Sequence, residues 1–178
     1  MKYKILFILL FIEFNLFSES SIQINNEVIR LSFKYKVNPN LVFAIIECES
    51  TFNERAISKN ISGSGMSIGL MQLNTCNRNW PLCDYFNVSK NIEEGVKTLK
   101  ECLELSKGDI DKALIYYNFG YGNYEMKKRP LPQITINYVK KVKSYYIYYM
   151  GKKQDILSGS ECRIIKVLTW RKNNVKNI

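Results

Sequence analysis

The chain has 178 residues, which suits one domain with a sizeable core, and 46% of them are hydrophobic. It contains no histidine, which excludes Ser–His and Cys–His nucleophile pairs and histidine-bearing zinc sites. Lysine and arginine number 26 against 16 acidic residues, so the formal net charge is +10. This basic balance suits anionic partners, namely nucleic acid, anionic lipid or a wall polymer, and a lysine-rich solubility surface is an equal alternative.

Residues 1–20 are typical of a secretory signal peptide. Two lysines precede an unbroken apolar run over residues 5–12, and Ser18 and Ser20 are small residues suited to cleavage. The run is short for a membrane span, and Glu13 makes a span less favourable. We therefore expect export to the periplasm or cell envelope, with an uncleaved anchor as the alternative.

Export makes disulfide bonds possible. The five cysteines are Cys48, Cys76, Cys83, Cys102 and Cys162. A Cys76–Cys83 bond would close a short loop, and the odd count leaves at least one thiol free or pairing between chains. The pairing therefore stays open. No CxxC spacing occurs, so we expect no metal site, and we expect no cofactor.

The first mature residues, 21–37, predict an amphipathic helix, because Val28, Leu31 and Tyr35 recur at helical spacing. This helix is expected to pack on the next one. Between the two, the chain contains an asparagine followed by a proline, which is a typical helix start.

The second predicted helix begins at Asn38-Pro39 and ends near Ser50. It is apolar nearly all round, so we expect it to be buried. Glu47 and Glu49 are two positions apart, which places them on roughly opposite sides of a helix. They are therefore not a paired acid and base, and we expect one to face a cleft and the other to be solvated.

Two stretches are predicted as loops from their glycine, asparagine and proline content, residues 53–67 and residues 76–84. The second loop contains Trp80, which is equally suited to the core or to a surface platform for a sugar ring. A third helix follows, with Ser89 or Asn91 as its N-cap.

The third helix is expected to stop at Gly108, where Asp109 caps a fourth helix that runs to Asn118. A basic, proline-bounded loop over residues 127–132 precedes a last long helix over residues 135–150. The sequence therefore predicts a mainly α domain over residues 21–150. Residues 151–178 form a basic C-terminal extension in which periodicity does not separate a strand from a short helix.

Glu49 has the local setting of a catalytic acid. It follows an apolar helix and lies in the last turn, so desolvation and the negative end of the helix dipole both raise the pKa of its carboxyl. A carboxyl that stays protonated near neutral pH is what glycosidic bond cleavage requires. From helix position alone, a solvated helix-end glutamate is the more common alternative.

Three short motifs occur in order, and they are Glu49-Ser50, Gly69-Leu70-Met71-Gln72 and Tyr117-Asn118-Phe119-Gly120. As an ordered set they resemble the hallmark motifs of the soluble lytic transglycosylase (SLT) family, which shares the goose-type lysozyme fold. The resemblance covers about residues 25–149, and Glu54 and Ile134 depart from the family's usual proline and glutamate. The loop over residues 60–72 resembles small specialised members that accompany secretion and conjugation systems.

The resemblance implies that Glu49 is the sole catalytic residue. It would act first as the acid on the glycosidic oxygen and then as the base on the C6 hydroxyl of N-acetylmuramic acid, which leaves a 1,6-anhydro end. The residues that the resemblance places along the substrate are Ser50, Met71, Gln72, Tyr117 and Asn118.

Within that set, Ser50 and Gln72 would hydrogen-bond the substrate. Tyr117 would hold Glu49 through its hydroxyl, and Asn118 would shape the turn beneath. The structural alternatives are core packing for Tyr117, a helix C-cap for Asn118, and a tight turn with a buried Leu–Met pair for the second motif.

The expected function is cleavage of the peptidoglycan glycan strand between N-acetylmuramic acid and N-acetylglucosamine by a monomer. The expected partners are glycan strands and, as for the specialised members, components of a secretion or conjugation apparatus, and not nucleic acid. The alternatives are a hydrolytic goose-type lysozyme and a non-catalytic wall-binding or assembly module of a secretion apparatus.

Overall fold

The structure is a computed structural model that describes residues 21–59, 65–77 and 80–151. The predicted signal peptide and the extension after residue 151 lie outside this part of the chain. Within the described residues, no helix is both long and apolar enough to cross a bilayer. Helices supply most of the elements, which confirms the mainly α prediction.

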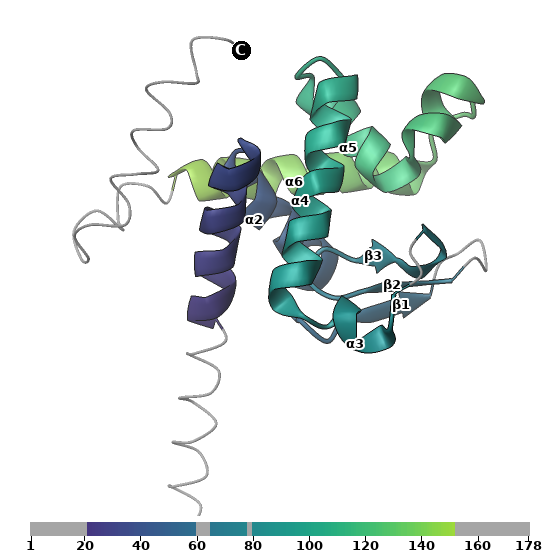
Figure 1. Cartoon of the computed structure of the whole chain (residues 1–178). Helices are drawn as coiled ribbons and strands as arrows, with labels where there is room; N and C mark the ends of the chain where they lie inside the picture. Colours follow the sequence, from purple (N-terminus) through teal and green to yellow (C-terminus); the bar gives the residue numbers. More distant parts are fainter. Residues whose placement is uncertain (1–20, 60–64, 78–79, 152–178) are drawn as a thin grey trace, which may run out of the picture.

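The first helix spans residues 21–35 and turns its apolar face inward, as predicted. Val28 and Leu31 on this face are fully buried. Near its end, Lys34 Nζ donates to Glu93 Oε1 at 2.6 Å, which ties the helix to a later one. Figure 1 shows this helix in purple, upright beside the teal helix α4.

Helix α2 (Pro39–Ser50) forms where the Asn38-Pro39 pair predicts a start. Asn38 Oδ1 accepts a hydrogen bond from the backbone N–H of Asn40 at 2.9 Å, and proline occupies the first helical position. The helix lies in the core, as its apolar sequence requires. Thr51 follows as its C-cap, with a left-handed backbone at φ 50°.

A small antiparallel sheet follows in the order β1 (Ile57–Lys59), β2 (Met66–Ile68) and β3 (Leu73–Asn74). Ile68 in the central strand pairs with both neighbours and is fully buried. The prediction that residues 53–67 form only a loop is therefore wrong. Strands of two or three residues are too short to show alternating polarity, so they leave no sequence signal.

The second predicted loop also contains helical turns, η1 (Thr75–Asn77) and α3 (Leu82–Tyr85). Trp80 is half-buried and packs on the core, with its ring 5.3 Å from that of Tyr85. This contact favours the core alternative for Trp80. Every cysteine that the structure describes is a free thiol, and these are Cys48, Cys76, Cys83 and Cys102.

Helix α4 (Val88–Leu105) is capped by Asn87, whose side chain accepts from the backbone N–H of Lys90 at 2.9 Å. The prediction of Ser89 or Asn91 as the cap is therefore wrong. Asn91 is instead buried within the helix, because its side chain bonds to other elements.

Helix α5 (Ile110–Phe119) begins at Asp109, which caps it as predicted by accepting from the Lys112 backbone N–H at 3.1 Å. Gly120 ends the helix with φ 92°. A π-helical turn, η2 (Gly122–Met126), follows shortly after this glycine.

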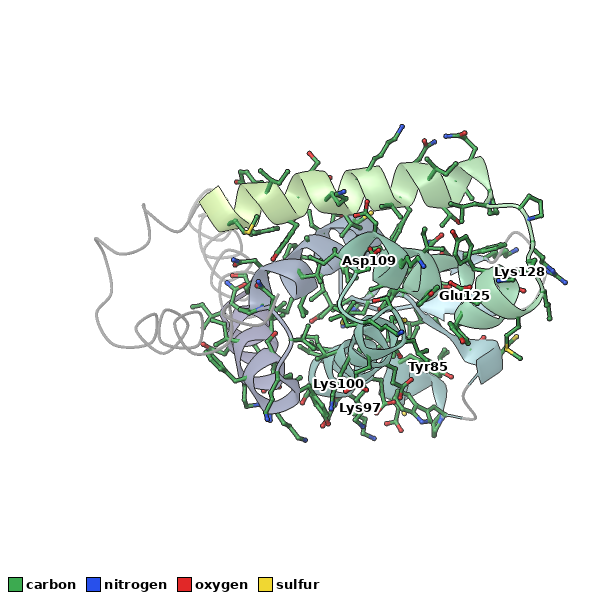
Figure 2. The ribbon with its side chains drawn as sticks, turned by 90° about the horizontal axis from the view of Figure 1, so that it is seen from above. Tyr85, Lys97, Lys100, Asp109, Glu125 and Lys128 are labelled. Carbon is green, nitrogen blue, oxygen red and sulfur yellow. The ribbon has the colours of Figure 1, made fainter. Side chains whose placement is uncertain are left out.

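Helix α6 (Gln133–Gly151) packs along α2 and against α5. Its buried residues are Thr135, Tyr138, Val139 and Val142, all in its first half. Figure 2 shows α6 running along one edge of the molecule. Figure 1 shows the small sheet beside the lower part of α4, next to α3. The end of α2 therefore leads from the helical core into the sheet.

Candidate active site

Glu49 lies in the last turn of α2, one residue before its end. The side chain is half-buried, so it keeps partial contact with solvent while protein surrounds most of the carboxyl. Burial raises the pKa of this carboxyl to about 7. The direction and the main cause agree with the sequence expectation for a glutamate that follows an apolar helix.

Two groups on α6 oppose this rise by favouring the charged carboxylate. The Tyr138 hydroxyl lowers the pKa of Glu49 by hydrogen bonding, and the Lys141 ammonium lowers it by charge. The Tyr138 hydroxyl is fully buried and makes no hydrogen bond of standard geometry with the described residues, so its contact with Glu49 is a loose one. Desolvation is the larger effect, so the net pKa stays near neutral.

Tyr138 is the site residue that the three sequence motifs did not single out. The signal was its position three residues after Thr135, on the face that α6 buries. Helical spacing predicts that such a tyrosine is buried. It does not predict which polar group the hydroxyl meets, because that group comes from another helix.

Glu47 differs from the sequence expectation of a solvated residue. It is half-buried, and its Oε2 accepts a hydrogen bond from the Tyr149 hydroxyl at 2.9 Å. This difference arises because the last turn of α6 packs on α2, where the Tyr149 ring also stacks on that of Phe43 at 5.5 Å. Glu47 and Glu49 therefore contact different parts of α6 and do not form an acid–base pair.

Ser50 connects the end of α2 to the Gly69–Gln72 turn. Its hydroxyl donates to the Leu70 carbonyl at 2.9 Å and lies 3.2 Å from the Ile46 carbonyl. The side chain is buried, so these backbone oxygens are its contacts. The residue after the candidate acid thus holds the second motif beside the first.

Gln72 closes the turn with a left-handed backbone at φ 49°. Its Nε2 donates to the Gly69 carbonyl at 2.9 Å and to the Ala56 carbonyl at 3.3 Å. Its Oε1 accepts from the Ser58 hydroxyl at 2.7 Å. The side chain therefore joins the turn to the first strand of the sheet, and its expected contact with substrate stays a prediction.

Asn91 supports the same turn from α4. Its Oδ1 accepts from the Met71 backbone N–H at 2.8 Å. Its Nδ2 donates to the Ile68 carbonyl at 2.9 Å and to the Tyr85 carbonyl at 2.8 Å. The packing is close, because a Cβ at Gly69 would lie 2.7 Å from the Tyr85 carbonyl oxygen.

Met71 itself is fully buried, as the alternative of a buried Leu–Met pair expects. A Cβ at Gly95 of α4 would lie 2.7 Å from the Met71 Cβ, so the absence of a side chain there admits the methionine. The Tyr117 hydroxyl donates to the Met71 carbonyl at 3.1 Å. The third motif is thus bonded to the second, and the expectation that Tyr117 holds Glu49 stays a prediction.

Asn118 is exposed, and its Oδ1 accepts from the Thr135 hydroxyl at 2.8 Å. This bond joins the end of α5 to the start of α6 and agrees with a role in shaping the turn. The three motifs therefore converge. Ser50 bonds to the turn, Tyr117 bonds to the turn, and Asn91 holds the turn from the side.

Sequence comparison identifies the family. The family model described as the transglycosylase SLT domain matches residues 27–134, which is more than half of the chain. The chain therefore belongs to the SLT transglycosylase family.

A solved structure shows the same fold. It is that of an inactive mutant of lytic transglycosylase Slt from Pseudomonas aeruginosa, which superposes with a TM-score of 0.59 at 22% sequence identity. The match covers 71% of this chain and 24% of that protein, so this chain spans about a quarter of its length. The mainly α, lysozyme-like fold is thereby confirmed.

Proposed function

We propose that this protein is a peptidoglycan lytic transglycosylase that uses Glu49 as its single acid and base. It would cleave the β-1,4 bond between N-acetylmuramic acid and N-acetylglucosamine and leave a 1,6-anhydro end. The observation that carries the proposal is a carboxyl with a pKa of about 7, set at the point where the three family motifs meet.

A pKa near neutrality suits a residue that must first give and then take a proton. The protonated carboxyl donates to the glycosidic oxygen as its bond to the muramic acid C1 breaks. The resulting carboxylate then accepts the proton of the C6 hydroxyl as that oxygen bonds to C1. The carboxyl ends in its starting state, and no water is consumed.

The surroundings of Glu49 support one carboxyl rather than two. A hydrolytic pair needs a second carboxylate beside the acid. Among the described residues, the groups that shift the pKa of Glu49 are a tyrosine and a lysine, with no second carboxylate. Glu47, two residues away, is bonded to Tyr149 instead.

Substrate contacts by Ser50, Gln72, Tyr117 and Asn118 belong to this proposal, as does export to the periplasm or cell envelope for local wall remodelling. Their bonds to backbone atoms and to Thr135 join the motifs to one another and to α6. A role beside a secretion or conjugation apparatus is the further expectation carried by the loop over residues 60–72.

The deciding experiment is mass spectrometry of the fragments that the mature protein releases from purified peptidoglycan. We expect 1,6-anhydro muropeptides from the native protein and none from Glu49→Gln. Glu47→Gln is the matched control, because it makes the same change two residues away on α2 and should keep the activity. Products heavier by one water would establish hydrolysis, and turnover by Glu49→Gln would remove Glu49 from the mechanism.

A further inference from the structure

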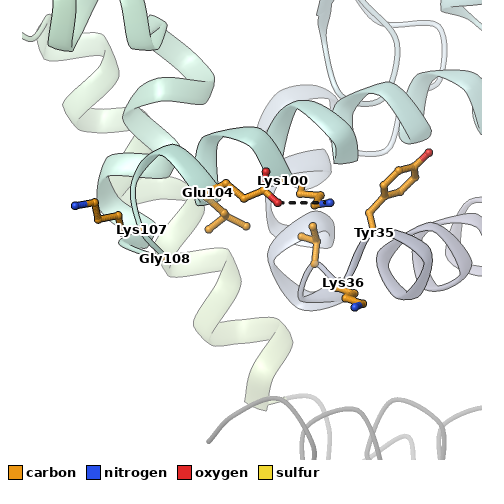
Figure 3. Close-up of a pocket in the computed structure, with 8 residues that line it drawn as sticks. Tyr35, Lys36, Lys100, Glu104, Lys107 and Gly108 are labelled. Atoms are coloured by element: carbon orange, nitrogen blue, oxygen red, sulfur yellow. Dashed lines mark ion pairs between the residues drawn. The ribbon is translucent and has the colours of Figure 1, made fainter. Parts of the chain in front are cut away.

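A pocket lies away from Glu49. It is an open pocket of about 440 Å³ between the end of the first helix, the chain leading into α2, and the last turn of α4 (Figure 3). The residues that line it are Tyr35, Lys36, Val37, Lys100, Leu103, Glu104, Lys107 and Gly108. We call it the lysine pocket.

The lysine pocket is separate from the candidate active site. It adjoins residue 37, before the start of α2, whereas Glu49 lies in the last turn of the same helix. At the rise of an α-helix, the residues between them span roughly 16 Å along the axis. A ligand in this pocket would therefore not occupy the position next to the candidate acid.

The charge of the pocket is unbalanced. Lys100 Nζ lies 3.5 Å from Glu104 Oε1, so this lysine and the one acid of the lining pair with each other. Lys36 and Lys107 are exposed and form no ion pair or side-chain hydrogen bond with the described residues. Two positive charges thus remain at the rim without a partner.

Both unpaired lysines also have a costly backbone conformation. Lys36 has φ 58° and Lys107 has φ 56°, in the left-handed region where glycine is the usual residue at a helix end. A lysine at a helix C-terminus also offsets the helix dipole, so its presence has a structural explanation as well. Peptide-binding measurements on variants of both lysines separate this structural role from binding.

The floor of the pocket is apolar. Val37 is 2% exposed, and Leu103 is partly buried against the core. An apolar floor between two free ammonium groups is complementary to an apolar side chain flanked by carboxylates. The open shape suits a peptide lying across the surface rather than an enclosed small molecule.

We propose that the lysine pocket docks an acidic peptide segment of a partner protein. Carboxylates of the segment pair with Lys36 and Lys107, and an apolar side chain between them rests on the partly exposed Leu103. This docking is independent of cleavage, so the protein could be held by its partner while the active site remains open to the glycan strand.

The test is fluorescence polarisation with an end-capped, fluorescein-labelled Glu-Glu-Leu-Glu-Glu peptide at physiological salt. The full mature chain should bind this peptide, and the double variant Lys36→Gln/Lys107→Gln should bind it about tenfold more weakly, because two charge-assisted contacts are lost. Replacing the central Leu of the peptide by Ser should also weaken binding, because the apolar contact is lost.

The matched control is Lys127→Gln/Lys140→Gln, which removes the same charge from exposed positions outside the pocket. Its binding should equal that of the native chain, and Glu49→Gln should also bind normally. The proposal is overturned if the native chain does not bind the peptide, if both double variants weaken binding equally, or if the pocket variant changes only the stability. Peptidoglycan cleavage, measured separately, should be unchanged in the pocket variant.

Discussion

At the scale of single residues, α6 supplies one tyrosine to each of two glutamates on α2. Tyr138 lies beside Glu49, and Tyr149 bonds to Glu47 at 2.9 Å. The two tyrosines are about three helical turns apart along α6. The inner one lies in the core beside the candidate acid, and the outer one lies near the end of the helix.

This arrangement allows a matched test of the active-site environment. The Tyr138 contact lowers the pKa of Glu49, so Tyr138→Phe should raise that pKa further above 7. The protonated carboxyl is the form that starts cleavage, and activity is lost as pH rises through its pKa. The alkaline limb of the pH–rate profile should therefore move to higher pH.

The control for this test is Tyr149→Phe, which makes the same change on the same helix. It removes the bond to Glu47 and should leave the pH–rate profile in place. An alkaline limb that moves equally in both variants, or that moves downward in Tyr138→Phe, would contradict the assignment of Tyr138 to Glu49.

At the scale of elements, one buried side chain joins α4 to the sheet and to the motif turn. Asn91 is 1% exposed and bonds to backbone atoms of Ile68, Met71 and Tyr85. All three bonds replace hydrogen bonds that these backbone groups cannot make to water. Buried backbone groups left without partners are destabilising, so Asn91 is necessary for this packing.

We therefore expect Asn91→Ala to lower the free energy of unfolding by on the order of 3 kcal/mol, because three buried groups lose their partner. Asn87→Ala is the control on the same helix. It removes the exposed N-cap bond to the Lys90 N–H and should cost about 1 kcal/mol. Urea titration of both variants measures the difference, and equal losses would show that Asn91 does not support the turn as described.

At the scale of the whole molecule, Glu49 makes stability depend on pH. Its pKa is raised from 4.5 to about 7 on folding, so the folded state holds this proton more tightly than the unfolded state. The resulting stability is fully present below the unfolded pKa and is lost as pH rises through the folded pKa. Above pH 7 the fold therefore contains a partly buried charge.

Replacing that charge should stabilise the protein under alkaline conditions. Glu49→Gln should raise the free energy of unfolding by on the order of 2 to 3 kcal/mol near pH 8 and by little near pH 4. Thermal unfolding of native and variant protein at the two pH values measures the effect. A variant that is no more stable than the native chain near pH 8 would mean that Glu49 is not desolvated.

The opposite pH effect comes from the contact between the first helix and α4. Lys34 and Tyr35 hydrogen-bond Glu93 and lower its pKa to about 2. Its contribution is present above the unfolded pKa and is lost as pH falls toward 2. Because this contact is largely exposed, solvent screening keeps its contribution small compared with that of Glu49.

The sequence by itself predicted the long helices and singled out the candidate acid. Asn38-Pro39 and Asp109 mark helix starts through local chemistry, and the apolar run before Glu49 predicts a desolvated carboxyl. These features depend on neighbours along the chain, so one sequence contains them. The ordered motifs likewise pointed to the SLT family, which the family match confirms.

Only the tertiary structure decided which groups meet across elements. The partners of Asn91 and Tyr138 lie on segments far away in the sequence, and helical spacing shows that a side chain is buried without showing what it contacts. The short strands, the Glu47–Tyr149 bond and the lysine pocket have the same origin. Each forms when segments pack together, and packing depends on the shape and position of every neighbouring element.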